Sequence, residues 1–350
     1  MLEFSSNPER IYRMRYLTRL LFLALVAALA WGGYWYLGAQ ATERGIQALL
    51  DAGRDDGWTA ETTTVATSGF PSRFDTTVKE LEIEDPGTGI GWSVPWVEVL
   101  SQSHKPTHLT AALAPQQELR LPGETLEIVS NQMRGTFDVA TTPALPLDQL
   151  VLEGEALKIA SSLGWTADIT STEVALRENP TEGAPVYDLE LAFNEFTPES
   201  KDIARLRQIA ALPEQVDTLS ASLTVRFNKP WHMRSIDSGR PQPREVRLNR
   251  LTARWGKLKI TGTGQINVSP EGVGTGKINL EATNWREILK LAEATRAIAP
   301  EHMPLVRRAL EAISRQSANP DKLKVPLRFA DGKLLIGPAP ICPVPPIVLP

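Results

Sequence analysis

Alternation of apolar and polar residues, the period of a strand with one buried face, dominates the chain after about residue 58. From Leu219 to Phe227 the odd positions are apolar and the even positions are Ser, Thr or Arg. Noisier alternation occurs at 74–78, 109–113, 157–159, 165–169, 189–193 and 325–329. Antiparallel sheets with one face on a core have this pattern. We therefore predict a mainly β protein, a β-rich α+β fold with a large curved antiparallel sheet and a few packed helices.

The longest alternating segment, residues 256–282, predicts two strands joined by a turn at 269–272. Its even positions are apolar or glycine, and glycines inside strands mark bends or the close approach of another backbone. We expect this hairpin to be sharply curved and its even face to line a groove. The candidate ligand-binding residues are Leu258, Ile260, Gly262, Gly264, Ile266, Val268, Gly274, Gly276, Ile278 and Leu280.

The same glycines exclude a nucleotide-binding loop. A phosphate loop requires Gly, four residues, then Gly-Lys-Ser/Thr, because backbone N–H groups surround the phosphates and the hydroxyl holds magnesium. Counting back from Gly276-Lys277 places Glu271 at the first glycine position, and Ile278 replaces the hydroxyl residue. Segment 272–278 is therefore interpreted as the returning strand of the hairpin.

The N-terminal segment has no charged residue between Arg19 and Glu43. At 1.5 Å per residue, such a helix spans roughly 30 Å or slightly more, the thickness of a bilayer's hydrocarbon core. Residues 20–42 are therefore a predicted transmembrane anchor. Four arginines precede it, so the positive-inside rule predicts that residues 1–19 are cytoplasmic and the rest periplasmic, with the anchor in the inner membrane.

Aromatic residues gather toward the outer end of this segment, at Trp31, Tyr34, Trp35 and Tyr36. Such rings favour the headgroup layer, which supports a retained anchor. A cleaved signal peptide is the alternative, because Ala39-Gln40-Ala41 fits a small-x-small cleavage pattern.

The remaining helices interrupt a β-rich domain predicted over 58–350. Helical spacing predicts a stalk helix at 43–57, a helix at 198–212 capped by Thr197, and a helical hairpin at 284–315 that starts after Asn284 and breaks near Pro300. Near the C-terminus, Asp331-Gly332 predicts another β-hairpin turn. The proline-rich tail after it is interpreted as an edge strand or a cover for the sheet, in preference to a polyproline segment that binds a partner.

Composition excludes several functional classes. The net charge of −4 gives no basic excess for nucleic acid, and the single cysteine, Cys342, permits no intramolecular disulfide. Of four histidines, His104 and His108 are closest, but Pro106 between them prevents the helical alignment of two metal ligands. We therefore expect no cofactor, no metal site and no catalytic residues.

Several segments in order resemble a proteobacterial family described as domain of unknown function 2125. They are SGFPSRFD at 68–75, GIGWSVPWVEVLSQSHKPTHL at 89–109, the strand of Arg254-Trp255-Gly256, TNWREIL at 283–289 and PLRFADGKLLIGPAPI near the end. In the first segment Ser72 replaces the family's usual aromatic residue. Long alternating strands behind one anchor also resemble AsmA-type envelope proteins, which implies curved sheets with an apolar groove for acyl chains.

Two functional hypotheses follow. In the first, the protein binds lipid or another hydrophobic ligand in the cell envelope, with the 256–282 hairpin lining the groove and the stalk holding it near the bilayer. In the second, it is a non-enzymatic scaffold, and the helices at 198–212 and 284–314 cover the sheet completely. The apolar face of a sheet must be buried against another element, and the predicted helices are too few to cover strands this long, which favours the first hypothesis.

Overall fold

The computed structural model describes residues 8–139, 147–183, 185–231, 241–315, 319–337 and 339–349. Within these ranges the chain forms four helices and 18 strands, and the register of every strand pair is antiparallel, so the predicted mainly β fold is confirmed. The helices are α1 (Pro8–Asp55), α2 (Lys201–Ala210), α3 (Trp285–Ala294) and α4 (Met303–Ser314). The first nine strands are β1 (Thr59–Glu61), β2 (Thr64–Ser68), β3 (Arg73–Asp85), β4 (Ile90–Gln102), β5 (Lys105–Leu113), β6 (Gln116–Leu121), β7 (Glu124–Val129), β8 (Gln132–Val139) and β9 (Leu147–Ser161). The other nine are β10 (Thr166–Glu178), β11 (Val186–Glu199), β12 (Val216–Phe227), β13 (Pro243–Trp255), β14 (Leu258–Val268), β15 (Gly274–Thr283), β16 (Lys322–Ala330), β17 (Lys333–Ile336) and β18 (Ala339–Pro343).

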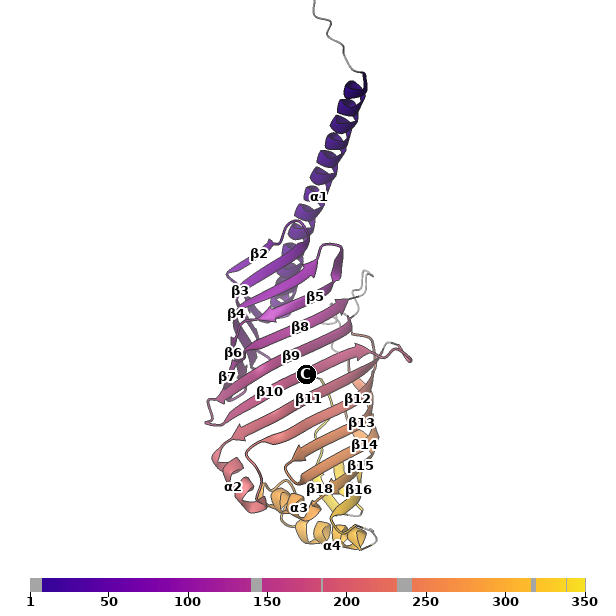
Figure 1. The fold of residues 1–350 in the computed structure, drawn as a ribbon. Helices are drawn as coiled ribbons and strands as arrows, with labels where there is room; N and C mark the ends of the chain where they lie inside the picture. Colours follow the sequence, from indigo (N-terminus) through magenta and orange to yellow (C-terminus); the bar gives the residue numbers. More distant parts are fainter. Residues whose placement is uncertain are drawn as a thin grey trace, which may run out of the picture.

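The strands make one continuous sheet that is strongly twisted and curved (Figure 1). From β9 to β18 each strand pairs with the next in the chain. Between β4 and β9 the sheet splits into two branches. In one branch β4 pairs with β5, β5 with β8 and β8 with β9; in the other β4 pairs with β6, β6 with β7 and β7 with β9. Strands β1 and β2 both pair with β3 at the first edge.

Helix α1 projects from the first strands and then continues into the interior of the curved sheet (Figure 1). Within it, Leu20–Asp55 is a candidate membrane span by length and composition. From Leu20 to Leu37 its large apolar side chains are exposed except for the partly buried Trp35, whereas farther along Ala39 and Leu50 are buried. The helix expected at 43–57 is present as the end of α1, and it packs on the sheet.

The last turns of α1 fill one end of the sheet's inner side. Leu50 packs in a cluster with side chains of β3, β4 and β5, among them Val78, Val97 and Ala111. The carboxylate of Glu43 accepts a hydrogen bond of 2.7 Å from the backbone N–H of Thr67. This end of the sheet therefore has its core supplied by the same helix that carries the apolar N-terminal segment.

Helices α3 and α4 close the opposite end, at the bottom of Figure 1. Trp285, Val306 and Leu310 form a core with residues of β16 to β18, including Leu323 and Ile341. The predicted helical hairpin is present with its expected break. Helix α3 follows Asn284 as expected, although the Asn284 side chain makes no capping bond.

Helix α2 differs from the prediction at its start. Its cap is Ser200, whose hydroxyl accepts a hydrogen bond from the N–H of Ile203, and the predicted cap Thr197 lies in strand β11. The reason is that the ladder between β10 and β11 extends to the pair Thr166–Glu199, which holds those residues extended. Helix α2 packs mainly on α3 and also contacts β11, and Leu212, just after the helix, is buried beside Leu258.

The C-terminal segment is an edge strand and a cover, as expected. After the turn at Asp331-Gly332, β17 pairs with β18, which forms the sheet's last strand. The backbone N–H of Ile347 then donates to Gly272 O at 2.8 Å. Residues 344–349 therefore lie across the turn between β14 and β15.

The packing of α1 predicts a contrast between two adjacent leucines. Replacing Leu50, which is 8% exposed, by Ala is expected to lower the free energy of unfolding by about 2–5 kcal/mol, because a cavity remains. Replacing Leu49, which is 45% exposed, is expected to change it by about 0.5 kcal/mol or less. Urea unfolding of the full chain in detergent, followed by tryptophan fluorescence, measures both. Equal small effects would show that the end of α1 is not held in the sheet.

Candidate functional site

Strands β14 and β15 form the predicted hairpin, with Gly264 opposite Ile278 and Ile266 opposite Gly276. All ten candidate residues lie on one face, because they alternate with exposed polar residues such as Lys259 and Lys277. Their exposure differs. Leu258, Gly262, Ile266, Val268 and Gly274 are buried, whereas Ile260, Gly264, Gly276, Ile278 and Leu280 are partly buried.

The glycines of this hairpin make room for the opposite strand. A Cβ on Gly264 would lie 2.3 Å from Lys277 O and 2.6 Å from Ile278 Cα, and one on Gly276 would lie 2.2 Å from Gln265 O. At Gly262 the obstacle is the side chain of Leu280, 2.6 Å away. The glycines therefore let the two backbones approach and let aliphatic side chains lie flat across them, which agrees with the expected close approach of another backbone.

The apolar face of the hairpin continues across almost the whole sheet. Residues that pair with one another across successive strands, from β3 to β17, form a row perpendicular to the strands. Every position in this row is apolar or glycine except one serine. The row is Phe74, Ser101, Leu109, Phe137, Leu150, Leu176, Leu189, Leu223, Leu248, Gly264, Ile278, Leu327 and Ile336. At about 4.8 Å between strands, this row measures roughly 55–60 Å along the curved sheet.

A second row runs beside the first on the same face. Its members are Thr76, Val99, Ala111, Gly135, Leu152, Val174, Leu191, Ala221, Leu251, Gly262, Leu280 and Val325. We call the two rows together the apolar face. Its ends coincide with the cores beneath α1 and beneath α3 and α4.

The middle of the apolar face is less well covered than its ends. Leu150, Leu176, Leu189, Leu223 and Leu248 are all only partly buried. On β12, Leu219 points to the same face and is 41% exposed. Within the described residues, a small buried cluster of Tyr187, Val225 and Phe227 packs on Leu176 and Leu223, so the aliphatic surface at the centre of the sheet is only partly covered.

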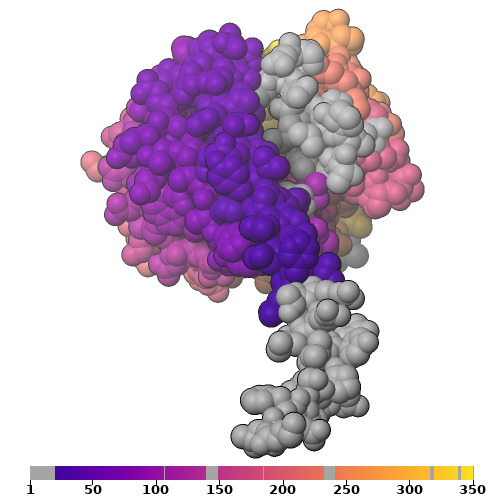
Figure 2. Space-filling model, turned by 90° about the horizontal axis from the view of Figure 1, so that it is seen from above, coloured from indigo at the N-terminus to yellow at the C-terminus, as the bar shows by residue number. Residues whose placement is uncertain are grey.

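The space-filling view from above shows how the sheet wraps around (Figure 2). Indigo and purple N-terminal elements lie on one side of the molecule, and pink and orange elements of the later strands and helices lie on the other.

The opposite face of the sheet is polar and carries ion pairs. Glu182 accepts hydrogen bonds from Arg226 and Arg247, and both arginines also lie near Glu245. The hydrogen bond from Arg247 lowers the pKa of the Glu182 carboxyl below its ordinary value, and the same bond raises the pKa of Arg247. These charges keep the outer face solvated and leave the inner face to apolar contacts.

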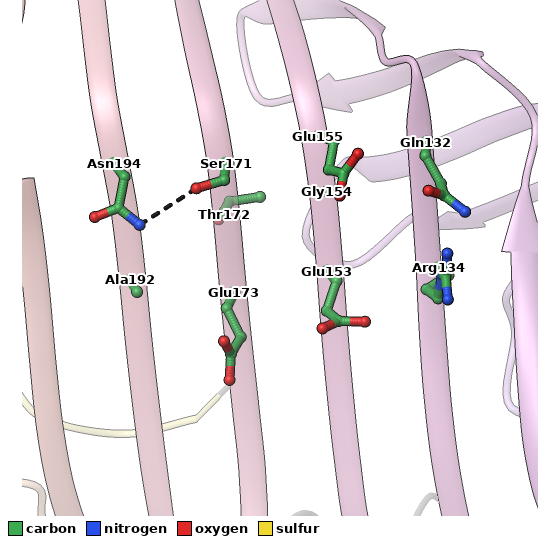
Figure 3. Close-up of a pocket in the computed structure, with 10 residues that line it drawn as sticks. All are labelled: Gln132, Arg134, Glu153, Gly154, Glu155, Ser171, Thr172, Glu173, Ala192 and Asn194. Carbon is green, nitrogen blue, oxygen red and sulfur yellow. Dashed lines mark hydrogen bonds between the residues drawn. The ribbon is translucent and has the colours of Figure 1, made fainter.

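The outer face also has an open polar hollow of about 300 Å³ (Figure 3). Arg134, Glu153, Glu173 and Ala192 are successive register partners across it, one residue out of step with the apolar face. Asn194 Nδ2 donates to Ser171 Oγ at 3.3 Å. The carboxylates spread over neighbouring strands, and within the described residues no group of three or more His, Cys, Asp or Glu is placed to hold a metal ion.

Two of the four histidines illustrate the distribution of polar groups. His108 on β5 pairs with Asp138 on β8, at the sheet surface. His104 is exposed in the turn between β4 and β5. His232 lies outside the described residues.

Sequence reasoning found the alternation in most of these strands but assigned binding residues only to β14 and β15. The leucines of β9 to β13 were missed as a site, because their connection appears only when the strand register is known. The signal that could have found them is the recurrence of aliphatic pairs two residues apart, such as Leu189 and Leu191.

Residues 35–345 match the family model described as an uncharacterized protein conserved in bacteria, domain of unknown function 2125. The chain belongs to this family. The match begins within α1 and ends in the C-terminal segment, so the family's defining region includes the part of α1 that packs on the sheet. The resemblance that the motifs indicated is confirmed.

No curated protein and no solved structure matches the chain significantly. The more distant likeness to AsmA-type proteins therefore stays a prediction.

The close approach at the hairpin predicts a large effect for a small substitution. Gly264→Ala is expected to lower the free energy of unfolding by about 1–3 kcal/mol, because its Cβ would meet backbone atoms that no rotamer change can move. The control is Gly45→Ala in α1, where no atom lies within 4 Å and the helix gains up to about 1 kcal/mol. Chemical unfolding of both variants tests this. A Gly264→Ala protein as stable as the wild type would contradict the close packing.

Proposed function

We propose that this protein is a membrane-anchored, non-enzymatic binding protein of the cell envelope, whose periplasmic β domain holds lipid acyl chains or another hydrophobic ligand. The observation that carries the proposal is the apolar face, which continues across the strands from β3 to β17 and is incompletely covered at its centre. An aliphatic surface of this length is costly to leave in water, at about 25 cal/mol for each Å². A lipid chain supplies the missing apolar cover without requiring any catalytic group.

The placement of the helices favours this proposal over the scaffold hypothesis. The scaffold requires helices that cover the sheet face completely. Helices α3 and α4 pack at the last strands, and α2 packs on α3. Among the central side chains, Leu176 and Leu223 pack beside a small buried cluster of Tyr187, Val225 and Phe227, whereas Leu219 stays 41% exposed and open to a ligand.

The contacts of α1 support a retained anchor over a cleaved signal peptide. Cleavage after Ala41 would remove Trp31, Tyr34 and Trp35, all of which hydrogen-bond to the folded domain. It would also remove buried Ala39 and the first residues of the family match. We accordingly propose a single-pass inner-membrane protein with a cytoplasmic N-terminus and a periplasmic domain.

The proposal is tested by photocrosslinking the full chain in cells. A benzophenone amino acid at Leu219, on the apolar face, is expected to form an adduct with phospholipid on illumination. The matched control is Ser220, the next residue on β12, whose side chain points to the polar face. Mass spectrometry of the purified protein identifies the adducts.

A blocking variant strengthens this experiment. Ala221 lies at the centre of the apolar face between Leu191 and Leu251, so Ala221→Trp adds an indole where a chain would lie. The lipid adduct at Leu219 is expected to fall about tenfold, the effect of losing about 1.4 kcal/mol of binding. Ser222→Trp on the opposite face serves as its control. Protein adducts at Leu219 would favour the scaffold, and no adduct at Leu219 would refute the lipid proposal.

A further inference from the structure

Three aromatic side chains of α1 are tied to the β domain by hydrogen bonds. Trp31 Nε1 donates to Pro71 O at 2.9 Å, Tyr34 Oη donates to Ser103 O at 2.6 Å, and Trp35 Nε1 donates to Arg73 O at 2.7 Å. The acceptors lie in two adjacent segments, residues 69–74, which lead into the start of β3, and residues 102–105, around the turn between β4 and β5. We call these two segments the collar.

The collar is held together and held at a fixed height on α1. Ser103 N–H and its hydroxyl both donate to Ser72 O, at 3.0 and 2.9 Å. Phe70 packs edge-on against Trp35, with ring centres 5.5 Å apart. Phe74 lies so close to Gly38 that an added Cβ would be 2.5 Å from its ring. The collar thus contacts α1 between residues 31 and 38.

Apolar side chains of α1 remain exposed beyond the start of this contact. Leu37 is 69% exposed, and Tyr36 beside it is 60% exposed. Leu37 lies about 9 Å farther along the helix axis than Trp31, at 1.5 Å per residue. A bilayer that covers Leu37 therefore also reaches the height of Phe70 and Pro71, which adjoin Trp35 and Trp31.

The chemistry of the collar suits a membrane interface. Phe70 is 59% exposed although it is large and apolar. Close to it, Arg73, His104 and Lys105 are exposed, and Arg73 is paired with Asp75. Basic side chains near an anionic bilayer are attracted to its negatively charged headgroups.

We propose that the collar is a second membrane contact, in which Phe70 and Pro71 enter the interfacial layer of the periplasmic leaflet and Lys105 faces anionic headgroups. The proposal rests on the anchor of the proposed function and adds that the β domain is seated directly on the lipid surface. Trp31, Tyr34 and Trp35, which are expected in the headgroup layer, then share that layer with the collar.

Lipid quenching of a fluorophore tests the seating in the full chain. With Cys342 replaced by Ser, single cysteines at Phe70, Leu163 and Leu25 are labelled with an environment-sensitive dye. The protein is reconstituted into vesicles of three parts phosphatidylethanolamine and one part phosphatidylglycerol, with or without lipid carrying a nitroxide near the headgroup end of its acyl chain. Leu163, in the turn between β9 and β10, is a matched control because it is 68% exposed. Leu25 reports whether α1 is inserted.

Strong quenching at positions 70 and 25, with none at 163, is the expected result. An unquenched dye at position 70 in protein whose position 25 is quenched would overturn the seating and leave the anchor intact. Unquenched dyes at both positions would overturn the anchor and the seating together.

The test separates this proposal from lipid binding on the apolar face. Quenching at position 70 together with no lipid adduct at Leu219 would support the seating and refute the bound lipid. Lipid adducts at Leu219 without quenching at position 70 would support the bound lipid and refute the seating.

Discussion

The structure depends on keeping one apolar face in register across a very large antiparallel sheet. Because side chains alternate with a period of two, a slip of one residue in any strand would exchange leucines for the arginines and glutamates of the other face. Glycines at Gly262 and Gly264 maintain the face where β14 and β15 approach most closely. The ion pairs of Glu182 with Arg226 and Arg247 lie on the other side of the same strands, so both faces specify the same register.

Helix α1 belongs to the apolar N-terminal segment and to the folded domain at once. Its outer turns expose leucines, its middle turns bond to the collar, and its last turns place Leu50 in a core of β-strand residues. Since the hydrogen bonds of a single helix run through all three parts, the orientation of the domain relative to the segment is set by a continuous rigid element.

Local sequence patterns were sufficient for the architecture and for one part of the candidate site. Strict alternation from Gly256 to Ala282 predicted the hairpin and the face of its ten residues, because strand parity is a local property. The lateral continuation through Leu189 and Leu223 depends on pairing between distant segments, which no local period contains. The same limit explains the wrong prediction of Thr197 as a helix cap, because pairing with β10 holds that residue in a strand. It also explains why the hydrogen bond of Trp31 was not predicted, since its acceptor, Pro71, lies 40 residues away.

The regular succession of strands from β9 to β18 has an evolutionary consequence. From β10 to β18 each strand pairs only with its neighbours in the chain, so inserting or deleting one hairpin there would leave the helical ends intact. Each added hairpin would lengthen the apolar face by roughly 10 Å, twice the strand spacing. The length of the apolar face is therefore set by the number of hairpins, and it can change among descendants while both ends of the sheet keep their packing.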